Sequence, residues 1–219
     1  MIEIVRDTET TGLSVKDGHR IVEIGCVELD DLIPTKKIFH FHLNPERKVS
    51  EEAFKVHGYS DEFLSDKKKF SEIADDFLEF IKDKKIIIHN AEFDIAHINN
   101  ELLIAGKEKI TKTNIVDTLD IARNKYPGSA INLDALCKRF RIDNSKREKH
   151  TALVDCELLA KVYINLLDQK EPILNFNEIK KNENNQKINN YSKKIIIPST
   201  DEINKHKEFL KKNFKRNFF

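Results

Sequence analysis

The chain has 219 residues, 39% of them hydrophobic and 34% charged, a balance that favours one folded domain with an appendage over two full domains. Its net charge of +1 hides an asymmetry, because residues 170–219 carry 12 basic and 6 acidic side chains whereas residues 1–169 carry 26 basic and 31 acidic ones. Residues 1–169 therefore lack the basic excess of a general nucleic-acid binder and would need cations to bind nucleic acid. No run approaches the roughly 18 apolar residues of a membrane span and no secretory leader is apparent, so we expect a soluble, cytoplasmic protein.

The expected secondary structure is of mixed type over the first 170 residues or so. β-Branched and aromatic runs predict strands over residues 2–10, 20–29, 37–45 and 84–90, and apolar residues at helical spacing predict helices over residues 50–58, 71–83, 91–106, 132–142 and 151–167. Residues 113–128 fit either a strand or the start of a helix. Three strands followed by alternating helices and strands favour an α/β domain around a mixed sheet.

The composition changes after the last of these helices. Residues 169–194 are rich in Asn, Lys and Gln without an apolar period, so they cannot bury enough surface to offset the entropy of ordering. Residues 195–219 combine a helix-capping signal with an apolar stripe that includes Ile203 and Leu210. The sequence therefore predicts a domain over residues 1–168, a flexible linker and a short docking segment.

An acidic pair ends the first expected strand. Asp7 and Glu9 alternate along that strand, so both carboxylates lie on one face, and a glycine turn follows at once. Two carboxylates within a few ångströms repel each other unless a cation lies between them, and Mg²⁺ with oxygen ligands is the ordinary solution. The pair alone is weak evidence for a metal site, because acids at this spacing also occur on solvated strands.

Two further segments carry candidate site residues. Asp94 stands in the first turn of an expected helix, where a carboxylate also interacts favourably with the helix dipole. His150 and Asp155 are five residues apart and hence about 140° out of phase on a helix, so we expect His150 in the preceding loop and Asp155 on the helix. An imidazole beside a fixed metal carboxylate is what a water-activating general base requires.

These segments together resemble a known family. DTETTGL at residues 7–13, HNAEFD at residues 89–94 and HTALVD at residues 150–155 are similar, in order and spacing, to the three motifs of the DEDD exonuclease superfamily, in the subclass whose base is histidine. VHGYSDEFL, LDALCKRFRIDNSKR and TDEINKH resemble the epsilon, or proofreading, subunits of bacterial DNA polymerase III, so the likeness covers nearly the whole chain. It implies an α/β, ribonuclease-H-like fold: a mixed five-stranded sheet flanked by helices, with a flexible C-terminal tail.

The resemblance also implies roles for individual residues. The residues implied to hold two divalent cations, Mg²⁺ or Mn²⁺, are Asp7, Glu9, Asp94 and Asp155, with Asp7 bridging the two. His150 is the implied general base. The residues implied to contact the 3′-terminal nucleotide are Thr10, Leu13, Glu52 and His57, together with Asp7, Glu9 and Asp155. The residue pattern alone favours structural roles for these two, with Glu52 as a helix-capping partner of Ser50 and His57 as a histidine near a helix C-terminus.

The implied function is proofreading: hydrolysis of mismatched 3′-terminal nucleotides from DNA, as nucleoside monophosphates, by a subunit of the replicative polymerase. The implied partners are the DNA 3′ end, the catalytic (alpha) subunit through Ile203 and Leu210, the sliding clamp through Leu174 and Phe176, and a small theta-like subunit. Two alternatives stay open. An RNA-trimming exonuclease could use the same metals and base, which do not read the 2′-hydroxyl, and the chain could be mainly a structural polymerase subunit.

One position departs from the family pattern. Arg6 precedes the first aspartate where the family usually has an apolar residue, and a buried, unpaired guanidinium is costly. Arg6 must therefore pair with an acid, extend to the sheet edge or weaken the first strand, and we do not expect it to touch the ligand set.

The remaining histidines and the cysteines are interpreted as structural. His40 and His42 lie on an expected strand, and histidines and cysteines never approach the spacing of zinc ligands along the chain. The three cysteines are odd in number and never in CxxC spacing, so neither a disulfide framework nor a structural zinc site is expected.

Overall fold

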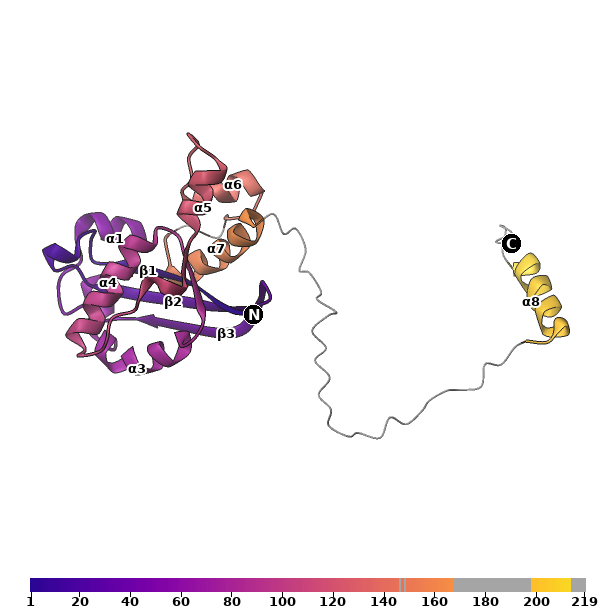
Figure 1. Ribbon diagram of the computed structural model, residues 1–219, viewed down its shortest axis with the longest axis horizontal. Helices are drawn as coiled ribbons and strands as arrows, with labels where there is room; N and C mark the ends of the chain where they lie inside the picture. The colour runs from indigo at the N-terminus through magenta and orange to yellow at the C-terminus, as the bar shows by residue number, and fades with distance from the viewer. Residues whose placement is uncertain (146, 148, 168–197, 214–219) are drawn as a thin grey trace. The chain divides into compact units, whose positions relative to one another are not determined.

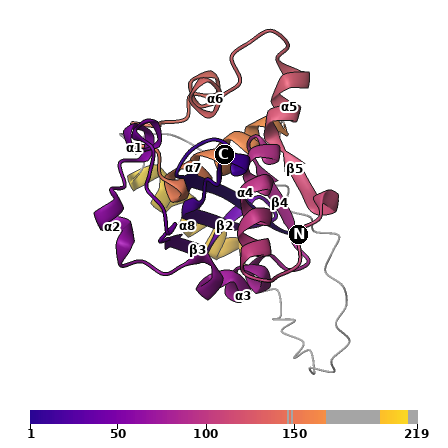
Figure 2. The same cartoon turned by 90° about the vertical axis from the view of Figure 1, so that its left-hand side faces the viewer.

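The computed structural model describes residues 1–145, 147, 149–167 and 198–213, and the chain divides into two units, Met1–Leu174 and Asn175–Phe219. The first unit is built on a five-stranded sheet in the order β3-β2-β1-β4-β5, of which Figure 1 labels β1, β2 and β3 and Figure 2 labels β4 and β5. The strands are β1 (Ile2–Thr10), β2 (Ile21–Asp30), β3 (Ile33–His42), β4 (Lys85–Ile88) and β5 (Ile115–Asp117). β2 pairs antiparallel with β1 and β3, whereas β4 pairs parallel with β1 and β5, so the expected mixed sheet is confirmed.

Helices connect these strands and cover the sheet. In chain order they are η1 (Val15–Asp17), α1 (Glu51–His57), α2 (Asp61–Ser65), α3 (Phe70–Ile81), α4 (Ala91–Ile104), η2 (Lys112–Asn114), α5 (Thr118–Lys125), α6 (Leu133–Phe140) and α7 (Ala152–Leu166). Residues 113–128, which fitted either a strand or the start of a helix, form both the strand β5 and the helix α5. The single-turn helix α2 was not predicted. Within the described ranges, no helix combines the length and apolar character needed to cross a membrane.

The third strand begins four residues earlier than predicted. Asp31 and Leu32 have φ angles of 47° and 66°, so a two-residue turn joins β2 directly to β3. A hairpin-like succession of the first three strands was expected, but the position of this turn was not, because Leu32 is not one of the residues that such turns prefer. β3 is an edge strand, which tolerates Pro34 near its start.

Apolar packing gives the first unit three layers. One face of the sheet packs through residues such as Ile4 and Ile24 against α3 and α4. The other face packs through Val5, Val27 and Ile87 against α7, and α5 and α6 pack on the far side of α7 (Figure 2). β1 is therefore covered on both faces, and its carboxyl end reaches the N-termini of α4 and α7.

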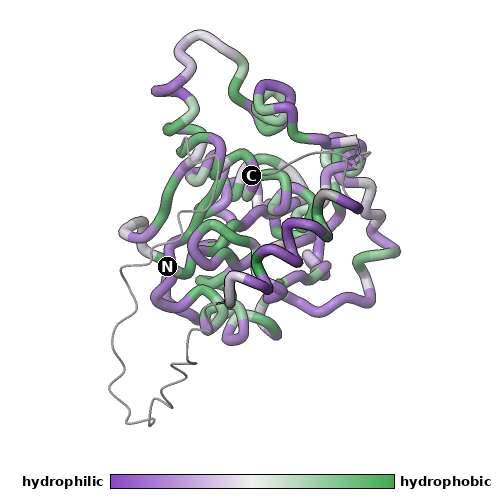
Figure 3. Tube along the Cα trace, turned by 90° about the vertical axis from the view of Figure 1, so that its right-hand side faces the viewer, coloured by the Kyte–Doolittle hydropathy of each residue, from purple (hydrophilic) through white to green (hydrophobic). Residues whose placement is uncertain are grey.

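The second unit contains α8 (Thr200–Asn213), a predominantly hydrophilic helix (Figure 3). The predicted cap is present, because the Glu202 backbone N–H donates to Ser199 Oγ at 3.3 Å and the Glu202 carboxylate accepts from the Ser199 backbone N–H at 2.8 Å. Ile203 and Leu210 are seven residues apart and share one side of the helix. The expected linker, with Leu174 and Phe176, lies outside the described residues.

Candidate active site

Three elements bring the five motif residues to the carboxyl end of β1. Asp7 and Glu9 lie on β1, Asp94 and Asp155 lie in the first turns of α4 and α7, and His150 lies in the loop before α7. α4 follows β4, which pairs with β1, so the sheet order itself places Asp94 beside the end of β1. Donor atoms of Glu9, His150 and Asp155 all lie within 4.8 Å of one another.

The carboxylates at this end of the sheet destabilise one another when all are ionised. Burial, and then repulsion from Asp94, Glu9 and Asp155, raises the pKa of Asp7 well above its usual range. Burial, and then repulsion from Asp155, raises the pKa of Glu9 to about 8. Neither Asp7 nor Glu9 forms an ion pair with a described residue. A set of crowded oxygen donors, in which Asp7 and Glu9 have no ion-pair partner among the described residues, fits the requirements of hard divalent cations.

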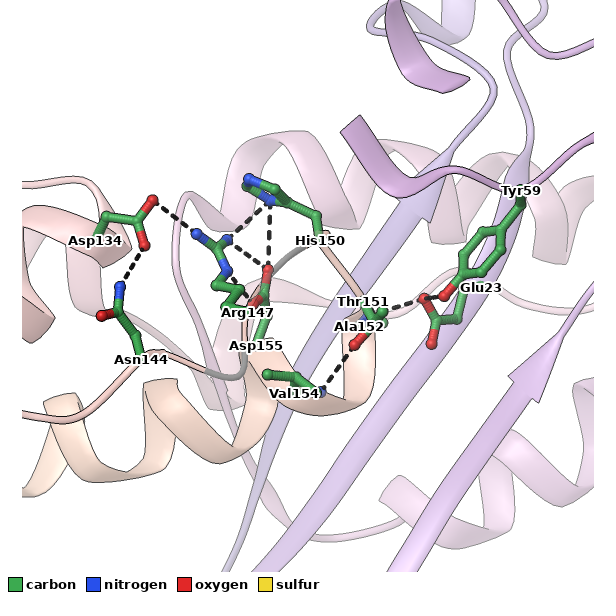
Figure 4. Close-up of polar contacts among 10 residues, drawn as sticks. All are labelled: Glu23, Tyr59, Asp134, Asn144, Arg147, His150, Thr151, Ala152, Val154 and Asp155. Atoms are coloured by element: carbon green, nitrogen blue, oxygen red, sulfur yellow. Dashed lines mark hydrogen bonds and ion pairs between the residues drawn. The ribbon is translucent and has the colours of Figure 1, made fainter. Parts of the chain in front are cut away.

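Arg147 binds the last of these carboxylates. Its Nε and Nη2 donate to the two oxygens of Asp155 at 2.5 and 2.6 Å, and its Nη1 pairs with Asp134 at 2.8 Å (Figure 4). Burial raises the pKa of Asp155, but the interactions with His150 and Arg147 outweigh that effect and hold it below its usual value. Arg147 stands inside a segment that carries the resemblance, yet no role was predicted for it, because nothing in the residue pattern indicates where a loop arginine points.

The same guanidinium also contacts the candidate base. Arg147 Nη2 lies 2.8 Å from His150 Nδ1, and since a guanidinium can only donate, Nδ1 is the acceptor. The neutral ring of His150 then carries its proton on Nε2. While this bond stands, neither ring nitrogen has a free lone pair with which to accept a proton.

Arg6 also contacts the candidate ligands, contrary to expectation. Its Nη2 lies 3.0 Å from Asp94 Oδ1, and both side chains are buried. Of the alternatives considered from sequence, pairing with an acid is the one observed, but the statement that Arg6 avoids the ligand set is wrong. The physical reason is that α4 begins directly beside β1, so the acid with which this buried guanidinium pairs belongs to the site.

A buried glutamate fixes the start of α7, and sequence reasoning missed it. Glu23 on β2 is 1% exposed, and its Oε2 accepts from the backbone N–H of Ala152 at 2.9 Å and from the Tyr59 hydroxyl at 2.8 Å (Figure 4). Ala152 stands between His150 and Asp155, so this bond holds the segment that carries the base and one carboxylate. Glu23 directly opposes Glu9 across the strand pair, a relationship that only the register of β1 and β2 reveals.

Gly25 allows α7 to approach the sheet closely. It pairs with Asp7 across β1 and β2, and a Cβ added to it would lie 2.7 Å from the carbonyl carbon of Ala152. The Cys156 thiol donates to the Gly25 carbonyl oxygen at 3.2 Å. A side chain at this position would push the N-terminus of α7 away from the carboxylates of β1.

A cavity of about 450 Å³ opens beside Glu9, between β1 and α1. The four residues that the resemblance places against a terminal nucleotide all line it: Thr10, Leu13, Glu52 and His57. Val56 and Phe93 line it as well and were not predicted. The backbone N–H of His150 donates to the carbonyl of Val56 at 3.2 Å, so the wall of the cavity is tied to the loop of the candidate base. The volume falls within the range of small-molecule sites.

Comparisons with known proteins agree with this arrangement. The family model described as "Exonuclease" matches residues 4–163. DNA polymerase III subunit epsilon of Rickettsia felis is 48% identical over 217 residues, which is 95% of this chain and 95% of that protein. The subunit epsilon of Escherichia coli K12 is 47% identical over 170 residues, which is 74% of this chain and 70% of that protein.

Solved structures share the fold at low sequence identity. Exonuclease X in complex with 5′-overhanging duplex DNA is similar with a TM-score of 0.60 and 24% identity, over 76% of this chain and 92% of that one. The nuclease domain of 3′hExo, a DEDDh family member bound to rAMP, is similar with a TM-score of 0.67 and 16% identity, over 77% and 92% of the two chains. The expected ribonuclease-H-like exonuclease fold is thus confirmed. On its family match and its identity to these relatives, the chain belongs to the exonuclease family that includes the epsilon subunits of DNA polymerase III.

Proposed function

We propose that the chain is a 3′–5′ exodeoxyribonuclease that proofreads for a replicative DNA polymerase, releasing mismatched 3′-terminal nucleotides as nucleoside monophosphates. The observation that carries this proposal is the convergence of four carboxylates and one imidazole beside a cavity of nucleotide size. Relatives named subunit epsilon over 95% of the chain favour this function over RNA trimming. A mainly structural subunit would have no need of the complete acidic set.

Four carboxylates would hold the two divalent cations, with Asp7 shared between them: Asp7, Glu9, Asp94 and Asp155. All their donor atoms are hard oxygens, which favours Mg²⁺ or Mn²⁺. When bound, such cations stabilise the negative charge that develops during phosphodiester hydrolysis and make water easier to deprotonate. Their charge would also relieve the repulsion that raises the pKa of Asp7 and Glu9.

His150 would take the proton from the attacking water. Its side chain is 45% exposed, so water reaches it, and it lies 3.5 Å from Asp155. The hydrogen bond from Arg147 must break first, because it leaves the ring without a free lone pair. Release of Arg147 would free Asp155 and His150 together, so one movement would make both a metal ligand and the base available.

The cavity beside Glu9 would hold the terminal nucleotide. Leu13 is 84% exposed and presents an apolar side chain against which a base could pack. His57 accepts from the Tyr59 backbone N–H through Nδ1 at 3.0 Å, and its Nε2 is buried. Nε2 of a neutral ring is then an N–H donor for the substrate, and Glu52 is an acceptor for its hydroxyl.

The remaining expectations complete the proposal. Residues 1–168 would form the exonuclease domain, residues 169–194 a linker, and residues 195–219 the segment that docks on the catalytic subunit through Ile203 and Leu210. Leu174 and Phe176 would contact the sliding clamp, and a small theta-like subunit is a further candidate partner. The cytoplasm, where a bacterial replicative polymerase works, is the proposed location.

The test is digestion by the full chain of a DNA primer with a mismatched 3′ end and of an RNA strand of the same sequence, each with Mg²⁺. We expect nucleoside monophosphates to be released from the DNA 3′ end, faster than from RNA. Asp7→Asn should abolish release, and His150→Ala should lower turnover by about 10²–10⁴ without loss of DNA binding. Asp76→Asn, at an exposed position of α3, is the matched control and should keep full activity. Cleavage in excess chelator, or preference for RNA, would overturn the proposal.

A further inference from the structure

A second cluster of metal-ligating side chains spans β2 and the edge strand β3. The strand register pairs Glu23 with His42 and Gly25 with His40, so two imidazoles and one carboxylate lie on the same face of the sheet. Donor atoms of Glu23, His40 and His42 all lie within 4.8 Å of one another. The spacing of the histidines along the chain gave no sign of this cluster, because the cluster forms across two strands.

The two carboxylate oxygens of Glu23 have different partners: one is hydrogen-bonded to other parts of the fold, and the other faces the two histidines. Oε2 accepts from Tyr59 and from the backbone N–H of Ala152. Oε1 lies 2.7 Å from His40 Nε2 and 3.8 Å from His42 Nε2. The hydrogen bonds to Oε2 orient the carboxylate and leave Oε1 available. Residues that hydrogen-bond to a metal ligand without touching the metal, its outer partners, commonly orient it in this way.

The cluster is accessible to a metal ion. The side chains of His40 and His42 are 28% and 27% exposed, so a cation can enter from solvent although Glu23 is buried.

We propose that Glu23, His40 and His42 form a second metal site, distinct from the catalytic carboxylates, that binds a borderline cation such as Zn²⁺ with solvent as a fourth ligand. Two imidazole nitrogens and one carboxylate oxygen favour zinc over magnesium, which prefers oxygen alone. Tetrahedral zinc with bonds of about 2.0–2.1 Å spaces its ligand atoms about 3.4 Å apart. The distances from Oε1 to the two Nε2 atoms are within about 1 Å of that value.

Occupation of this site would join the edge of the sheet to the start of α7. Glu23 Oε1 would hold the cation while Oε2 keeps Ala152, two residues after His150. A cation bound only by the folded chain stabilises it by mass action. We therefore expect Zn²⁺ to raise the thermal midpoint of unfolding of the full chain, and to do so when Mg²⁺ is already in excess.

The test is a calorimetric titration with Zn²⁺ of the full chain carrying Asp7→Asn and Asp155→Asn, which disable the catalytic carboxylates. We expect one Zn²⁺ per chain. His42→Ala in that background should weaken binding by more than about 100-fold, since it removes a direct ligand and loss of an outer partner alone costs about 10–100-fold. Lys36→Gln on the same strand and His206→Gln on α8 are the controls and should leave the affinity unchanged.

A second measurement keeps the proposal testable if the histidine variants unfold. X-ray absorption of the otherwise unaltered chain, loaded with one equivalent of Zn²⁺ in excess Mg²⁺, should show two imidazole nitrogens around zinc. The catalytic cluster offers only one imidazole among the described residues, His150, so the two locations differ in this count. A single imidazole, absence of Zn²⁺ binding, or unchanged affinity in a folded His42→Ala variant would each overturn the proposal.

Discussion

Arg6 and Asp94 form a buried ion pair at the base of the candidate active site, with 3.0 Å between Nη2 and Oδ1. The same oxygen of Asp94 accepts a hydrogen bond from Thr8 at 2.7 Å. None of the three guanidinium nitrogens of Arg6 has a hydrogen-bond partner among the described residues, so the contact with Asp94 is electrostatic. A fixed cation thus already neutralises one of the four carboxylates assigned to divalent metals, and it competes with them.

The first prediction concerns this competition. Arg6→Met should lower the free energy of unfolding of the metal-free protein by about 3 kcal/mol at neutral pH, because it leaves a buried carboxylate without its cation. It should also tighten Mn²⁺ binding, since Asp94 no longer has to leave a guanidinium. Urea unfolding with chelator and with saturating Mn²⁺ measures both effects. Arg6→Lys, which keeps the charge, is the control, and an Arg6→Met variant as stable as the parent in chelator would contradict the prediction.

The second prediction concerns Glu9 and pH. Its pKa is raised to about 8 in the folded chain from an ordinary value of 4.5, first because the side chain is buried and second because the Asp155 carboxylate repels its negative charge. Between these values the folded state binds more protons than the unfolded state, so the stability of the metal-free protein is complete below about pH 4.5 and falls as pH rises towards 8. Glu9→Gln should remove this loss, on the order of a few kcal/mol, and raise stability at pH 8.

Denaturant unfolding in chelator at several pH values between 5 and 8, in roughly even steps, measures the slope. Glu92→Gln, at an exposed position in the first turn of α4, should leave it unchanged. Added Mg²⁺ should flatten the slope of the parent protein, because bound cations keep Glu9 ionised at little cost. Equal slopes for the parent and Glu9→Gln in chelator would show that Glu9 is not held at a raised pKa.

The parts of the molecule that sequence could predict are those with a local cause. Ser50 accepts from the Ala53 backbone N–H at 3.2 Å and begins α1 where the cap pattern placed it, and Gly58 ends it with a φ of 79°. The alternation of Asp7 and Glu9 and the loop position of His150 also follow from spacing alone, because strand and helix periods are fixed by the backbone.

The parts that could not be predicted depend on which strands pair and where loops fold back. Glu23 meets Ala152 across 129 positions, and its cluster with His40 and His42 needs both the order and the register of the sheet. Arg147 lies in a charged loop with no periodic pattern, so its bonds to Asp155 had no signal in the sequence. From the sequence, an ion pair with some acid was one of three alternatives for Arg6. The sequence could not identify Asp94 as that acid, because the two residues meet only when α4 folds beside β1.

The third prediction concerns Arg147. Its guanidinium binds both Asp155 oxygens and His150 Nδ1, so it occupies a proposed metal ligand and the lone pair of the proposed base. Arg147→Gln should lower the Mn²⁺ concentration needed for half-maximal binding about 10-fold, since Asp155 no longer has to be released. Calorimetric titration with Mn²⁺ measures this, with Arg123→Gln on α5 as the exposed control. Weaker Mn²⁺ binding by a folded Arg147→Gln variant would mean that the arginine supports metal binding.

The fourth prediction separates two kinds of glycine. Gly25→Ala puts a Cβ 2.7 Å from Ala152, so the start of α7 must shift, and we expect exonuclease activity to fall by at least about 100-fold as Asp155 and His150 move from Glu9. Gly106→Ala meets nothing within 4 Å but requires a φ of 69°, so it should cost about 1 kcal/mol of stability and leave activity unchanged. Full activity in a folded Gly25→Ala variant would contradict the close packing of α7.

The last prediction concerns the second unit. α8 presents Ile203, which is 39% exposed, and Leu210 on one side, and the proposed function gives these two side chains to the catalytic subunit of the polymerase. Apolar side chains at helical spacing dock into grooves of partner proteins, and an aspartate there would have to be buried without a partner.

Changing Ile203 and Leu210 together to aspartate in the full chain should therefore weaken association with the purified polymerase catalytic subunit by at least about 100-fold in a direct binding assay. Exonuclease activity on free DNA should stay within about twofold, because the candidate catalytic residues all lie in the first unit. Asn204→Asp adds a charge to another side of α8, about 100° away, and should leave association intact. Unchanged association of the double variant, or loss of its nuclease activity, would be evidence against a docking role for this helix.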